Sequence, residues 1–173
     1  MFLLYPFTHL EDFIRNVYFK LNITTPSQLH LNEIADALNI GVFRLPSPSQ
    51  ALQFDGRYYI FLDSRLPEQN QFEEFGHELG HILLHTGNQQ NMSMSYRHYQ
   101  EWKANLFAYH FCVPTFMLLK LSNELLTSYK VSEVFGVSER FAHIRIEQFW
   151  NKRLYYQCSN RVEYVAEDPP RKE

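Results

Sequence analysis

The chain has 173 residues, of which 45% are hydrophobic and 16% are aromatic. This length and composition suit one hydrophobic core; they exclude a disordered chain and leave little room for two independent domains. The formal net charge of −3 supplies no overall positive field, so direct binding to nucleic acid is not expected.

The N-terminal segment begins with apolar residues but has the features of neither a signal peptide nor a membrane anchor. It lacks a basic start and a cleavage site of small residues, and His9, Glu11 and Asp12 interrupt it too early for a bilayer span. Cys112 and Cys158 are too few for a disulfide framework and form no C-x-x-C metal pair. We therefore expect a cytoplasmic protein that does not associate with membranes.

Two helices and a β-hairpin are predicted in the first third of the chain. Residues 8–21 have a threonine at the N-cap position and an acidic first turn, and residues 31–38 form a second, shorter helical pattern. The run VFRLP at 42–46 predicts a strand. Asp55-Gly56 joins two β-rich runs and is a strong hairpin signal. A small antiparallel or mixed sheet should therefore precede the next helix.

The segment HELGH at 77–81 places two histidines four positions apart, with a glutamate directly after the first. On a helix, predicted at about 70–85, His77 and His81 lie on the same face and can hold one metal ion. Two imidazoles and an oxygen ligand suit Zn²⁺, which leaves a fourth position for water. Glu78 can reach such a water as a general base without being a ligand. Surface histidines on a helix are the alternative interpretation.

A third ligand is predicted in EWKANLFA, residues 101–108, on a second helix that can fold back against the first. Glu101 is the candidate ligand. Asn105, one turn later, could accept a hydrogen bond from the non-ligating nitrogen of His77 and fix its tautomer. A solvated glutamate and an ordinary buried asparagine are the alternatives.

Candidates for holding the oxyanion of a peptidase reaction cannot be separated by sequence alone. They are Tyr96, His98, Tyr99 and His110. His85 extends the histidine series but lies about 12 Å from His77 along a helix axis, too far to share one ion. The polar residues 86–96 predict a mobile lid.

HELGHILLH followed by E-x-x-A-N-x-F-A and Pro114 resembles the ImmA/IrrE family of zinc metallopeptidases. The likeness covers roughly residues 25–150, with Gly76 a departure where the family tends to carry alanine. The resemblance implies an α+β fold with a zincin-like core, bound Zn²⁺ and the ligand set His77, His81 and Glu101. It further implies that Glu78 is catalytic and that the substrate is a helix-turn-helix repressor of a prophage or mobile element.

An exposed strand beside the metal could bind an extended peptide by adding it to the sheet. We expect the strand Tyr58–Leu62 to do this; internal pairing alone is the alternative.

The sequence after Pro114 predicts mainly helices. We divide the chain into a metallopeptidase domain, 1–126, and a helical unit packed on it, 127–173. In the second, helices at about 128–135 and 138–150 flank Gly136 in the pattern of a helix-turn-helix. A β-hairpin is predicted around Ser159-Asn160.

The sequence leaves two alternatives to a repressor-cleaving peptidase. One is a regulatory DNA-binding protein with structural zinc, for which Arg140 and Arg145 would lie on the exposed face, offset by Glu139 and Glu147. The other is the metallopeptidase half of a toxin–antitoxin-like pair, which shares the chemistry and differs in its partner. The sequence does not indicate an oligomeric state.

Overall fold

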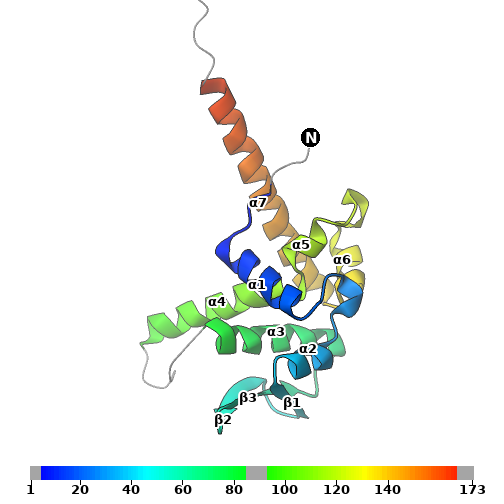
Figure 1. Ribbon diagram of the computed structural model, residues 1–173, viewed down its shortest axis with the longest axis vertical. Coiled ribbons are helices and arrows are strands. Elements are labelled where there is room, and N and C mark those ends of the chain that lie inside the picture. Colours follow the sequence, from blue (N-terminus) through cyan, green and yellow to red (C-terminus); the bar gives the residue numbers. More distant parts are fainter. Residues whose placement is uncertain (1–4, 85–92, 167–173) are drawn as a thin grey trace, which may run out of the picture.

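The computed structural model describes residues 5–84 and 93–166, with side chains described as far as residue 158. It is a mixed α+β fold with a small sheet near one end and helices stacked above it (Figure 1). In chain order the helices and strands are α1 His9–Lys20, α2 Leu31–Ala37, β1 Ile40–Leu45, β2 Gln50–Phe54, β3 Arg57–Asp63, α3 Glu68–Leu84, α4 Met94–Cys112, α5 Thr115–Leu118, α6 Ser128–Phe135 and α7 Glu139–Ala166. Short 3₁₀ turns lie at Pro26–Gln28 and Asn123–Leu125.

Helix α1 begins where the sequence predicts, because Thr8 and Glu11 form a reciprocal cap. The Thr8 hydroxyl accepts from the Glu11 backbone N–H at 3.2 Å, and the Glu11 carboxylate accepts from the Thr8 N–H at 2.7 Å. Two of the backbone donors that a helix start leaves unpaired are satisfied in this way.

The predicted hairpin is confirmed, with β2 and β3 antiparallel about Asp55 and Gly56. Both turn residues have positive φ, 50° and 73°, as a type I′ turn requires. Strand β1 pairs with β3 in parallel, so the sheet is mixed and its order is β1-β3-β2.

This strand order corrects the prediction for Tyr58–Leu62. That segment belongs to β3, the central strand, and both of its edges are already paired. It cannot receive a peptide as an additional strand. A free edge is available on β2 instead.

One face of the sheet packs against α2 and α3 (Figure 1). Ile60 and Leu62 of β3 are fully buried on this face. Helix α4 lies against α3 on the side away from the sheet, and the interface between the two helices contains Phe75, Phe107 and Phe111, all fully buried. The core therefore places α3 between the sheet and α4.

The C-terminal part differs from the prediction in length and content. Helices α6 and α7 flank Gly136, whose φ of 65° ends α6 in the left-handed conformation. Helix α7 has 28 residues and continues through Ser159-Asn160, so the predicted β-hairpin there is wrong. After Pro114 only Thr115–Leu118 is α-helical before α6.

Arg145 is fully buried rather than exposed, and it donates to the Val113 carbonyl at 3.1 Å and to the Thr115 hydroxyl at 2.6 Å.

Of the predicted lid, residues 86–92 lie outside the described residues, as does His85, while α4 already begins at Met94. Among the helices that the structure describes, none combines the length and apolarity needed to cross a bilayer.

Candidate metal centre

The two histidines of HELGH lie one turn apart on α3, with their rings nearly perpendicular at 79°. Their Nε2 atoms are 3.1 Å apart. Two neutral imidazoles cannot both direct a lone pair into such a short gap without a proton or a cation between them. The distance suits either an N–H···N hydrogen bond or two lone pairs directed at one metal ion.

Glu101 reaches the same point from α4. Its Oε2 is 3.3 Å from His77 Nε2, and its Oε1 is 3.4 Å from His81 Nε2. Ligand atoms bound about 2.0–2.1 Å from a tetrahedral Zn²⁺ lie about 3.4 Å from one another. The three observed separations are of this size, with the two Glu101 distances ending on different oxygens of its carboxylate. The donor set and its spacing therefore fit a tetrahedral ion with one position left for water.

Asn105 lies one turn after Glu101 on α4. Its side-chain Oδ1 is 3.1 Å from Nδ1 of His77. When Nδ1–H donates to this oxygen, the Nε2 lone pair is free and points toward Glu101. The contact with Asn105 is therefore compatible with the tautomer of His77 that a metal ion requires.

Glu78 is buried next to the candidate ligand His77, with 8% of its surface exposed. Burial raises the pKa of its carboxyl to about 6; His77 and a hydrogen bond from the Ala51 backbone N–H oppose this rise, and Glu74 and Glu101 add to it. The carboxylate is therefore more basic than a surface glutamate. Its bond to Ala51 also ties α3 to the free edge of β2.

Close packing of α3 on α4 depends on two glycines, a feature that the sequence reasoning missed. A Cβ at Gly80 would lie 3.1–3.2 Å from the Phe107 ring and from Ala104 Cα and O, and one at Gly76 would lie 2.8 Å from Cys112 Sγ. The bulk of Cys112 accounts for glycine at position 76. The spacing Gly-x-x-x-Gly could have indicated this contact, because it places both glycines on one helix face.

We expect Gly80→Ala to weaken metal binding although it adds a better helix former. The new methyl group would push against the α4 backbone at Ala104, three residues from Glu101, and move the third ligand away from the histidines. The expected result is about a 10-fold loss of Zn²⁺ affinity, comparable to the loss of an outer-shell contact, with a stability cost of about 1–3 kcal/mol. Competition with a chromophoric chelator measures the affinity. A more stable variant with unchanged affinity would contradict this role.

The four residues predicted as candidates for holding the oxyanion lie in two different parts of α4. Tyr96, His98 and Tyr99 are exposed on the first half of α4, the half that precedes Glu101. His110 lies elsewhere, about 13 Å beyond Glu101 along the helix axis. It is largely buried, with Nδ1 3.8 Å from Glu11 Oε1, and the structure does not bring it to the metal ligands.

His110 belongs to a buried polar cluster that joins α1, α4, α5 and α7. Glu11 is its centre and accepts from Tyr5 at 3.0 Å, from Thr115 at 2.7 Å and from Lys152. Burial alone would raise the pKa of Glu11. Hydrogen bonds from Lys152, the Thr8 N–H and Thr115 outweigh this effect and lower the pKa to about 2. Burial, with Arg145 nearby, lowers the pKa of His110 to about 3. At neutral pH the cluster therefore holds a charged glutamate and a neutral histidine.

Comparison with known proteins agrees with this geometry. The profile of the IrrE N-terminal-like domain, peptidase family M78, matches residues 35–147. The chain belongs to this family. The matched region contains the sheet, helices α3, α4 and α6, and the beginning of α7, and it includes all the residues of the candidate metal centre.

Two proteins of Bacillus subtilis (strain 168) are similar to this M78 family member over most of their length. "Phage-like element PBSX protein XkdA" is 38% identical, with 91% of this chain and 81% of the relative covered. "Uncharacterized protein YqaB" is also 38% identical, with 91% of this chain and 94% of the relative covered.

Proposed function

We propose that the chain is a zinc-dependent endopeptidase of narrow specificity. The supporting observation is the convergence of His77, His81 and Glu101: the two Nε2 atoms are 3.1 Å apart, and each lies 3.3 or 3.4 Å from one of the two oxygens of the Glu101 carboxylate. Such spacing from two separate helices suits a tetrahedral ion. The peptidase family of the chain gives the reaction class.

In this proposal each side chain has a distinct task. His77, His81 and Glu101 hold the zinc ion, and Asn105 orients His77. When bound, zinc supplies a Lewis acid that acidifies water and polarises a peptide carbonyl. Glu78 accepts the proton of the attacking water and then donates it to the leaving nitrogen.

The free edge of β2 is the proposed binding site for an extended substrate. Phe54 and Arg57 flank the two-residue turn of the hairpin, so their backbone N–H and C=O groups bond to each other. In an antiparallel pair, hydrogen-bonded and non-hydrogen-bonded residue pairs alternate, so the backbone N–H and C=O groups of Ala51 and Gln53 point away from β3. Ala51 already donates to Glu78. A segment that pairs with this edge would therefore run past the catalytic carboxylate.

The proposed substrate is a helix-turn-helix repressor of a prophage or mobile element in the cytoplasm, so that cleavage derepresses genes. Family likeness supports this choice, as does the phage-like element named for one relative. A partner from a toxin–antitoxin-like pair would involve the same chemistry. The DNA-binding alternative is weakened because Arg145, one of the two cations it needed, is buried.

Incubation with the helix-turn-helix repressor encoded beside the gene tests the proposal. We expect intact mass to show two fragments whose masses sum to that of the repressor plus one water. A chelator should reduce the rate about 10³-fold or more, because the Lewis acid is removed, and added Zn²⁺ should restore it. Cleavage that continues unchanged in chelator would contradict zinc dependence. Stable repressor with zinc-loaded protein would contradict this substrate.

A further inference from the structure

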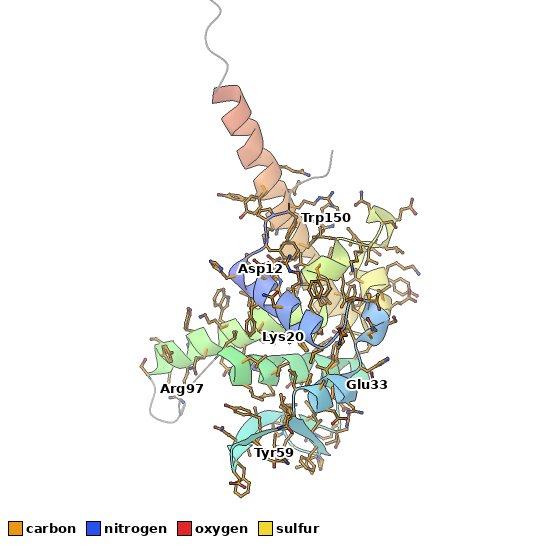
Figure 2. All side chains as sticks on the ribbon, in the orientation of Figure 1. Asp12, Lys20, Glu33, Tyr59, Arg97 and Trp150 are labelled. Carbon is orange, nitrogen blue, oxygen red and sulfur yellow. The ribbon has the colours of Figure 1, made fainter. Side chains whose placement is uncertain are left out.

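The outer face of the sheet is apolar, although no helix covers it in the described parts of the chain (Figure 1). Alternation places every second residue of each strand on this face, and the register aligns them across the sheet. The large apolar side chains on it are Phe43, Leu45, Leu52, Phe54, Tyr59 and Phe61; we call this set the outer sheet face. Figure 2 labels Tyr59 near its centre.

The exposure of this face is unusual for a sheet with one side in solvent. Phe43 is 51% exposed, Leu52 49% and Phe54 75%, with Leu45 at 44%. Sheets with one solvated face normally alternate apolar and polar residues, whereas strands covered on both sides are apolar throughout. These strands resemble the second pattern on their solvent-exposed face, where most positions carry large apolar side chains, although Gln50 and Arg57 are polar. The sequence is therefore that of a sheet covered on both faces, and one cover is missing from the monomer.

The described chain does not supply this cover. Tyr5, at the start of the described residues, stacks on Phe149 of α7 with ring centroids 5.4 Å apart; Figure 2 shows the neighbouring Trp150 far from Tyr59 of the sheet. Residues 85–92 and 167–173 have the sequences HTGNQQNM and EDPPRKE, which are too polar to cover six large apolar side chains. Another molecule is therefore the expected occupant.

We infer that the outer sheet face binds the same face of a second copy of this chain. Two sheets pack face to face about 10 Å apart, and an identical face matches the size and apolarity of the first. Three strands are about 14 Å wide, more than one helix of about 10 Å diameter covers. A two-fold axis that runs between the two sheets, perpendicular to the strands and level with the middle of β3, would place the two Arg57 side chains at opposite ends, so they would not face each other.

The available area suits a reversible dimer. A large apolar side chain presents about 150–250 Å², so the four most exposed residues contribute roughly 400 Å² per copy. With Tyr59, Phe61 and the rim, the total for two copies exceeds about 1,000 Å², the lower range for a specific interface. We expect association in the micromolar range.

The dimer leaves the candidate active site open, because α3 and the metal ligands lie on the other side of the sheet and the edge of β2 is not covered. This inference does not rest on the proposed peptidase function.

Sedimentation velocity over a concentration series tests the inference with the full chain. We expect the unmodified protein to shift from monomer to dimer as concentration rises. The double variant Leu52→Thr/Phe54→Thr should stay monomeric, with at least a 10-fold weaker association. Both side chains are exposed and threonine suits a strand, so the monomer should keep its fold and its circular dichroism spectrum.

Leu154→Thr/Tyr155→Thr on α7 is the matched control, since these residues are 53% and 67% exposed far from the sheet. It should dimerise normally. Hydroxyl-radical footprinting of the unmodified protein gives a second measurement, in which Phe43 and Phe54 should become protected as concentration rises. Two results would overturn the inference. One is a protein that stays monomeric at all concentrations, which would assign the outer sheet face to a different partner protein. The other is a dimer that is disrupted only by the Leu154→Thr/Tyr155→Thr variant.

Discussion

Glu78→Gln is expected to lower the rate of cleavage by about 10³–10⁴-fold while the protein still binds Zn²⁺. Glutamine has the same shape and can still accept the hydrogen bond from Ala51, but its amide cannot take a proton from water. The ligands His77, His81 and Glu101 are unchanged. Single-turnover cleavage and metal content, measured on the same preparation, separate loss of the base from loss of the ion.

Glu68→Gln is the matched control, because Glu68 lies in the exposed first turn of the same helix. It removes one carboxylate from α3 without touching the site and should cleave at the normal rate. Undiminished cleavage by pure Glu78→Gln protein would refute the role of Glu78 as the base.

Glu11→Ala is expected to produce the largest loss of stability, about 3–5 kcal/mol in the free energy of unfolding. The change removes the acceptor for Tyr5, Thr115 and the N-cap of α1, and it leaves Lys152 and buried Arg145 without a nearby anion. Urea denaturation at neutral pH measures the effect.

Asp12→Ala is the control for this prediction, because Asp12 lies in the same first turn but pairs with Arg15 at the surface, at 2.8 Å. Surface ion pairs contribute at most about 1 kcal/mol. Equal losses from the two variants would show that the buried cluster does not stabilise the fold.

Acid should destabilise the protein through the same cluster. The pKa of Glu11 falls from 4.5 to about 2 on folding, and that of His110 from 6.5 to about 3. Both shifts mean that the unfolded chain binds more protons, so stability rises with pH. The contribution of Glu11, about 3 kcal/mol, is complete above pH 4.5 and is lost as pH falls toward 2. Glu11→Gln should flatten this part of the profile.

Local features of the fold follow from short sequence signals. Thr8 and Glu11 form a cap within four residues, and Asp55-Gly56 fixes a hairpin through its own backbone conformations. The HELGH helix and the approach of Glu101 are also predictable, because a metal ion needs ligands that meet and the sequence contains one suitable partner helix. Asn105 then follows from helical spacing.

Features that depend on distant pairing could not be predicted in this way. The order β1-β3-β2 requires β1 to pair with the second strand of the hairpin, and alternation is the same whether a strand is central or at an edge. Around Ser159-Asn160 the aromatic residues suggested strands, but neither turn residue is glycine and α7 simply continues. Glu11 and His110 are separated by almost a hundred residues, so their contact leaves no local pattern.

In the proposed zinc peptidase, the division of the ligands between two helices couples metal binding to the docking of α4 on α3. An unfolded chain offers only the histidine pair, which binds far more weakly, so each zinc ion acts as a removable cross-link that favours the native ensemble. When cellular zinc is scarce, the apo population will open more often at this junction and be degraded first. The abundance of the protein, and not only its turnover number, should therefore follow zinc supply.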